Sequence, residues 1–334
     1  MLFSTTLQQV AILLAIIFAG YYLRKKEIIT AQGKSVLAGL LVNLFSPCYG
    51  IMSLSTIINV NDIKKYAILL IAGIVFAIIS VFLALPFAKA VGKERFHRNI
   101  YKYAFAFGNV GYFGYPLINA VFGAVARAQM ILFCVPLNIV IASYGYYILT
   151  EPVSMDGSLQ EIKIPLKNRL KRLFSMPMIS SLIGIALGLL SSGIGFTIPK
   201  IFVDLFTTIG NCQSAPAMLL TGAVLASVPM LKLFSSIKAY LVGVIRILIM
   251  PLVFSAIVAI VYLLGWRDAD FMRIAFFFIV SSAMPVGMNV VVYPESAGLD
   301  STEGATSCFI SYVLALVMLP IIFSVLMKVI AVSF

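Results

Sequence analysis

Ten apolar segments, each long enough to cross a lipid bilayer as a helix, alternate with short charged connections along the 334-residue chain. A bilayer core requires about 20 mostly apolar helical residues. Because 62% of the residues are hydrophobic and only 11% are charged, a soluble domain of this length could not bury so much apolar surface. The pattern therefore predicts an all-α polytopic membrane protein surrounded by membrane lipid. The predicted spans, numbered 1 to 10 in chain order, are 5–23, 33–58, 65–90, 100–124, 126–148, 174–192, 201–228, 236–264, 271–294 and 303–330.

The first segment, 5–23, is predicted to be a retained span rather than a signal peptide, because its basic cluster Arg24, Lys25 and Lys26 follows it instead of preceding it. The cysteines give no sign of a metal site or a disulfide framework, since they lie inside apolar segments without C-x-x-C spacing. They are Cys48, Cys134, Cys212 and Cys308. We expect no metal and no cofactor.

The net charge of +12 has a topological explanation, because the basic residues lie in short connections and not in the charge-rich segments typical of nucleic-acid-binding proteins. One set of alternate connections holds sixteen Lys and Arg residues, and the other set holds seven. Cytoplasmic loops carry the excess of positive charge. We therefore expect a multi-pass protein of the plasma membrane (the inner membrane of a bacterial cell) with both termini outside, and no nucleic acid partner.

One sizeable polar connection, 150–172, divides the predicted spans into two groups of five. A repeat of an odd number of spans must insert its second copy upside down, which is common among secondary transporters. The sequence thus predicts a first five-span repeat at 1–149, a cytoplasmic linker at 150–172 and a second, inverted repeat at 173–334.

Prolines at matching spans support this repeat. Pro47 and Pro216 lie in the second span of each half, Pro116 and Pro285 in the fourth, and each pair is separated by 169 residues. A duplicated unit would keep its helix breaks in register. Equal spacing at the same span positions therefore favours a duplication.

The fourth spans of both halves, spans 4 and 9, have unusual compositions. Residues 108–116 read GNVGYFGYP, and residues 281–289 read SSAMPVGMN. Glycine and proline weaken a helix, and unwound backbone inside a membrane needs a protein or water environment. One interpretation is a small-residue packing face with a kink. The other is a pair of broken helices, 4 and 9, that cross near the midplane and direct half-helix N-termini at an anion.

These motifs resemble the auxin efflux carrier family, which includes the plant PIN carriers and bacterial relatives. The most specific match is Asn109-x6-Pro116 with Gly114-Tyr115-Pro116-Leu117, similar to the family's crossover ending in Gly-Ile-Pro-Leu. Further matches are residues 180–184 (SSLIG), Arg246 five residues before Pro251, and residues 284–287 (MPVG) where plant members show Leu-Pro-Gln-Gly.

The resemblance implies ten helices in two inverted repeats, with a scaffold of spans 1, 2, 6 and 7 and a transport domain of spans 3–5 and 8–10. It also implies an elevator motion and a homodimer held by the scaffold. Two departures from plant members are the short central loop and Val286 in place of a polar crossover residue. They favour a bacterial-type member that carries a small organic anion, a carboxylate, over one that carries auxin.

Asn109 is the leading binding candidate, because an amide donates to a carboxylate without adding a charge; capping the broken helix is its alternative role. Arg246 either contacts substrate or holds carbonyls freed by the crossover. Asn289 either contacts substrate or packs against a neighbouring helix. The predicted substrate-binding residues are Asn109, Gly111, Tyr112, Pro116, Pro285, Gly287, Asn289, Ser46 and Pro47.

An intramembrane enzyme is not predicted, because all twelve Asp and Glu lie at span ends or in loops and the single histidine, His97, lies in a loop. The same absence of acids inside the spans disfavours built-in proton coupling and favours electrogenic export by uniport. A sodium- or proton-coupled organic anion symporter of the bile-acid-transporter type is the alternative.

Overall fold

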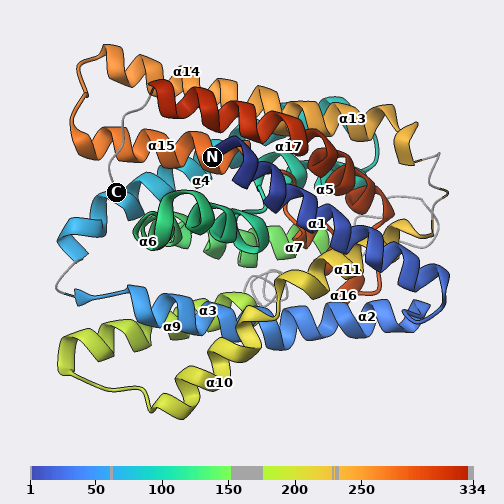
Figure 1. Ribbon diagram of the computed structural model, residues 1–334, viewed down its shortest axis with the longest axis horizontal. Coiled ribbons are helices and arrows are strands. Elements are labelled where there is room, and N and C mark those ends of the chain that lie inside the picture. The colour runs from blue at the N-terminus through green and yellow to red at the C-terminus, as the bar shows by residue number, and fades with distance from the viewer. Residues whose placement is uncertain (1, 61–62, 152–175, 228, 230–232, 330–334) are drawn as a thin grey trace.

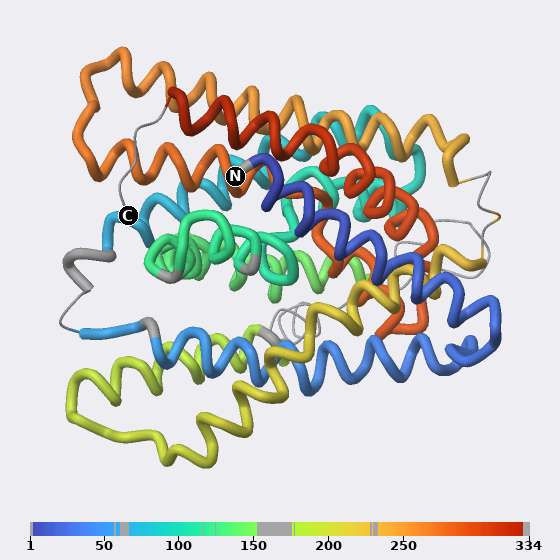
Figure 2. The backbone as a smooth tube through the Cα atoms, viewed as in Figure 1, coloured from blue at the N-terminus to red at the C-terminus, as the bar shows by residue number. Residues whose placement is uncertain are grey.

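The computed structural model describes residues 2–60, 63–151, 176–227, 229 and 233–329. Their regular structure is helical, apart from one isolated antiparallel bridge between Gly108 and Val286. Figure 1 shows α2, α3, α9 and α10 along one long side of the molecule, and α14, α15 and α17 along the other. The first and last helices, α1 and α17, pack side by side although most of the chain separates them, as Figure 2 shows.

The first half of the chain contains α1 (Leu2–Lys25), α2 (Ala31–Leu40), α3 (Ser46–Ile57), α4 (Ile63–Val91), α5 (Arg95–Ala106), α6 (Tyr115–Val140) and α7 (Tyr146–Leu149). These helices fall on predicted spans 1 to 5. Spans 4 and 5 meet inside α6 at a kink at Gly123, whose φ of 85° suits a residue without a side chain.

The second half contains α9 (Met176–Ile194), α10 (Lys200–Asn211), α11 (Ser214–Leu225), α13 (Ile237–Val244), α14 (Met250–Leu263), α15 (Ala269–Ala283), α16 (Asn289–Ser296) and α17 (Thr302–Val329). These helices fall on predicted spans 6 to 10. Spans 7 and 9 are each divided into two helices. The predicted linker at 150–172 lies outside the described residues except for Thr150 and Glu151.

Three prolines follow π-helical turns at the same distance. The turns Leu41–Phe45, Val110–Gly114 and Ile245–Ile249 end two residues before Pro47, Pro116 and Pro251, respectively. A proline lacks an N–H and its ring collides with the carbonyl four residues earlier, so the helix widens locally where the proline is kept inside it. These prolines bend the helices without ending them.

Within the described residues, six helical stretches are long and apolar enough to cross a membrane. They are Phe3–Lys25, Ala31–Thr56, Ala67–Val91, Val125–Leu149, Ile237–Leu263 and Thr302–Val329. The other four predicted spans are short or interrupted helices. The all-helical membrane class is therefore confirmed, whereas the ten crossings and the inverted repeat stay predictions.

Glycines bring two helix pairs into close contact. A Cβ atom at Gly20 of α1 would collide with the Leu219 carbonyl of α11, and one at Gly222 of α11 with the Ile17 carbonyl of α1. In the second pair, a Cβ at Gly184 of α9 would lie 2.8 Å from the backbone of α3. Small residues let helix backbones approach closely in membrane proteins. We infer that α1 with α11, and α3 with α9, form rigid pairs.

Candidate functional site

The first helix break separates α5 from the helical turn that begins at Val110. Asn109 has non-helical angles (φ −78°, ψ 68°), and its Oδ1 accepts a hydrogen bond from the Tyr112 N–H at 3.1 Å. This bond caps the following turn. The break thus lies at Gly108 and Asn109, inside the segment 108–116 that was singled out, while Pro116 follows a π-helical turn that continues into α6.

The second break separates α15 from α16, and the two breaks pair with each other. The Asn109 N–H donates to the Pro285 carbonyl at 2.7 Å, and the Gly287 N–H donates to the Phe107 carbonyl at 3.0 Å. The Val286 N–H donates to Ser311 Oγ of α17 at 3.1 Å. Backbone groups that have left a helix are thereby satisfied inside the protein, as a membrane interior requires.

Arg246 lies between the ends of the helices that lead into the two breaks, and its side chain is fully buried. Its guanidinium donates to the carbonyls of Met284 (2.9 Å), Phe105 (2.8 Å) and Ser281 (3.1 Å). The last carbonyls of a helix have no partner within it, so a buried cation is well placed to bind them. Of the two roles open to Arg246, the geometry shows the structural one.

A cavity of about 110 Å³ lies beside the paired breaks. Its walls include six of the predicted site residues, namely Ser46, Asn109, Gly111, Tyr112, Gly287 and Asn289. Pro47, Pro285 and Arg246 are absent from the described lining. Pro116 is the second residue of α6, and its place in the site stays a prediction. No described lining residue is charged.

A chain of polar side chains crosses the cavity. The Tyr112 hydroxyl donates to Asn289 Oδ1 at 3.1 Å and lies 3.4 Å from Ser46 Oγ. The Ser214 hydroxyl donates to the Tyr112 carbonyl at 2.7 Å. Tyr112 therefore connects predicted span 4 to spans 2, 7 and 9.

The two crossover asparagines lie in different environments. Asn109 is 2% exposed, caps the turn after the first break, and donates through Nδ2 to the Tyr312 hydroxyl. Asn289 is half-buried at the first position of α16, where its side chain faces Tyr112. The capping role of Asn109 is thus present in the structure, while direct contact of either amide with a ligand stays a prediction.

Several polar residues at the site were not singled out by the sequence analysis. Tyr103 and Asn138 line the cavity, and Ser311 and Tyr312 support the breaks from α17. An amide in an apolar segment was a usable signal for Asn138, which lies two residues after Pro136. The tyrosines and Ser311 gave no comparable signal, because such residues also occur singly in ordinary membrane helices.

Comparison with protein families gives a match over nearly the whole chain. Residues 5–323 match the model of a family described as membrane transport protein. No curated protein matches the chain. The family is one of transporters, which agrees with the apolar helices and with the expectation that the chain is not an enzyme. The chain therefore belongs to the membrane transport protein family, the group of the auxin efflux or PIN-like carriers.

Proposed function

We propose that this protein is a secondary transporter that binds a small organic anion, a carboxylate, in the cavity beside the paired breaks and exports it. The observation that carries the proposal is that two helical stretches begin at the wall of the cavity. Gly111 lies in the first turn of one of them, and Asn289 lies at the start of the other. Helix N-termini carry partial positive charge and free N–H groups, which favour an anion.

Because no described lining residue is charged, the cavity favours a ligand with a single negative charge. Hydroxyls and amides can hydrogen-bond one carboxylate, but a second carboxylate would be buried without a cation and would be costly to desolvate. The volume of about 110 Å³ also favours a small ligand. We therefore expect monocarboxylates to bind better than dicarboxylates.

The packing of the helices supports an inverted repeat. The contact of span 1 with the second part of span 7 (α1 with α11) has its counterpart in the contact of span 6 with the second part of span 2 (α9 with α3). In the same way α4 contacts α5 and α6, while α14 contacts α15 and α13 contacts α17. Exchanging each span for the span of the same position in the other half converts one set of contacts into the other, as a duplication requires.

We propose that this arrangement moves as an elevator, as the family resemblance implies. The scaffold would be spans 1, 2, 6 and 7, and the moving body, spans 3–5 and 8–10, would carry both breaks and the bound anion. A location in the plasma membrane, termini outside the cell, and a homodimer held by the scaffold complete the proposal. Cysteine accessibility from each side of intact cells tests the orientation.

The binding proposal is tested by thermal unfolding of the purified protein with small mono- and dicarboxylates, because a ligand stabilises the state that it binds. We expect monocarboxylates to raise the melting temperature of the natural protein more than that of Asn289→Ala at the same ligand concentration. The matched control is Asn43→Ala, which removes an exposed amide that bonds only to Gly39 of its own helix. No stabilisation by any carboxylate, or equal stabilisation of Asn289→Ala, would contradict the proposal.

Uniport is tested by currents in proteoliposomes. With equal pH on both sides and no sodium, we expect a current that follows the anion gradient, since each complete transport cycle moves one net negative charge across the membrane. Strict dependence of transport on a sodium or proton gradient would instead favour the coupled symporter.

A further inference from the structure

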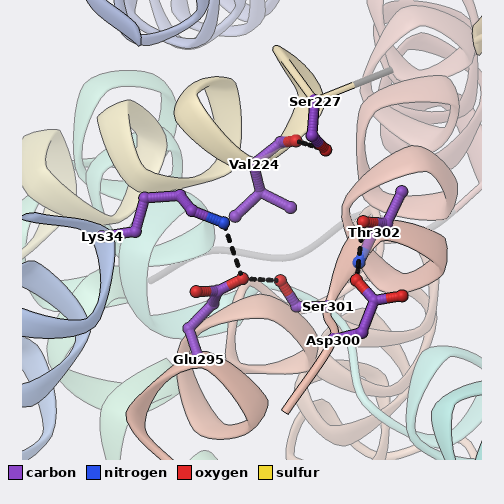
Figure 3. Close-up of polar contacts among 7 residues, drawn as sticks. All are labelled: Lys34, Val224, Ser227, Glu295, Asp300, Ser301 and Thr302. Atoms are coloured by element: carbon purple, nitrogen blue, oxygen red, sulfur yellow. Dashed lines mark hydrogen bonds and ion pairs between the residues drawn. The ribbon is translucent and has the colours of Figure 1, made fainter. Parts of the chain in front are cut away.

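An ion pair joins two helices of opposite halves at one end of the molecule. Lys34 belongs to α2 and Glu295 to α16, and Lys34 Nζ lies 3.3 Å from Glu295 Oε1. The same carboxylate oxygen accepts a hydrogen bond from Ser301 Oγ at 2.7 Å. Figure 3 shows the lysine and the serine meeting at this one oxygen.

The pair is largely shielded from water. The side chains of Lys34 and Glu295 are 18% and 8% exposed, and Ser301 is fully buried. An ion pair that is shielded in this way is weakened little by salt, and removal of one partner leaves the other charge buried without compensation. The pair therefore favours the arrangement in which α2 and α16 are in contact.

These two helices belong to different bodies in the proposed elevator. α2 continues into α3, which packs against α9 and α10 in the scaffold. α16 begins at the second break and belongs to the moving body. Among the ion pairs between described residues, Lys34 with Glu295 is the one that joins a scaffold span to a span of the moving body.

We propose that the Lys34–Glu295 ion pair is a latch that stabilises this conformation of the carrier against the one reached after the body moves. The inference rests on the proposed elevator function. The hydrogen bond from Ser301 Oγ holds the Glu295 carboxylate in place when Lys34 moves away. The ion pair can therefore break and re-form without a rearrangement of the loop. Removing either charge shifts the conformational equilibrium toward the moved state.

The test measures the distance between the two bodies. Spin labels are placed at Leu190→Cys of α9 and Val325→Cys of α17, both exposed positions, after the four natural cysteines have been replaced by alanine. Pulsed electron paramagnetic resonance then gives the distribution of distances between the two spin labels. We expect Glu295→Gln to raise the ratio of the second population to the first by about tenfold, within the usual range of coupling between sites.

Three further variants sharpen the result. Lys34→Met with Glu295→Met removes both charges, leaves none buried alone, and should shift the populations in the same direction. Exchanging the charges, Lys34→Glu with Glu295→Lys, should restore the natural distribution. The matched control is Asp300→Asn in the same loop, because Asp300 bonds only to Thr302 and its replacement keeps the acceptor.

The possible failures are distinguishable. The latch alone would be overturned if Glu295→Gln and the double methionine variant both show the same two distance populations as the natural protein. This comparison uses variants that elute as folded protein in gel filtration. An equal shift in Asp300→Asn would also overturn it, by showing a general effect of loop charge. A single distance in every variant, with and without carboxylate, would overturn the elevator proposal and the latch with it.

Discussion

The two helix breaks contain the same kinds of residue but use them differently. At the first break, Asn109 is buried and bonds to the protein through both its oxygen and its nitrogen. At the second, Asn289 is half-buried at the cavity and accepts a hydrogen bond from Tyr112, a residue of the first break. The first amide stabilises the paired breaks, and the second faces Tyr112 in the cavity where we propose that the ligand binds.

This difference shows how two breaks of similar composition can divide their tasks. Because each break satisfies backbone groups of the other, both must keep their shape, and glycine is required where they touch. A Cβ at Gly108 would collide with the Arg246 guanidinium and lie 2.8 Å from Met284 Cβ. Side chains that project away from this contact are free to differ between the two breaks. Four substitutions test this division, in order of decreasing expected effect.

Arg246→Met should have the largest effect on stability. It leaves the carbonyls that the guanidinium binds without a donor in a buried site, and each unsatisfied group costs about 1–3 kcal/mol. The measurement is thermal unfolding in detergent, with Arg127→Met, an exposed arginine, as control. A melting temperature equal to that of the control would show that the crossing does not depend on this cation.

Asn109→Ala should destabilise the fold by about 1–2 kcal/mol, through loss of a helix cap and of the bond to Tyr312. Asn109→Asp keeps the acceptor for Tyr112 and should recover part of this loss. Comparison of the two melting temperatures checks the prediction. If Asn109→Ala is as stable as the natural protein but no longer binds carboxylate, the amide acts on the ligand and our comparison of the two breaks fails.

Asn289→Ala should show the opposite pattern. We expect the affinity for a monocarboxylate to fall about tenfold, from the loss of roughly 1.5 kcal/mol for a hydrogen bond to a charged group, with little change in melting temperature. Calorimetric titration measures the affinity directly. Unchanged affinity would place the ligand away from the start of α16.

Ser46→Ala should have the smallest effect. Its hydroxyl lies 3.4 Å from the Tyr112 hydroxyl, which is long for a bond between hydroxyls, so we expect a change in affinity of less than about threefold. The same titration measures it. A loss as large as that of Asn289→Ala would mean that Ser46 contacts the ligand itself.

The sequence predicted the helices well. Six of the predicted site residues line one cavity, and their role in binding stays a prediction. Apolar length and the basic loops located the helical segments, because the bilayer imposes the same requirement on each of them. The segment 108–116 contains the first break, at Gly108 and Asn109. The sequence did not show which of its residues would interrupt the helix, since a proline can be kept within a helix by a π-helical turn. Tyr312 and Asn138 were missed because their contacts arise only in the folded chain, where α17 and α6 lie near the breaks. Tyr312 accepts a hydrogen bond from Asn109, and Asn138 donates one to Tyr115.

Arg246 also gives the proposed moving body a permanent positive charge, since a guanidinium keeps its proton at physiological pH. With a monoanion bound, the two charges cancel, and the membrane field exerts little net force on the loaded body. Empty, the body carries its charge through the field, which corresponds to about 2.3 kcal/mol per 100 mV for a complete crossing. Voltage should therefore act mainly on the return step. An inside-negative membrane would draw the empty site toward the cytoplasm, where an exporter must reload.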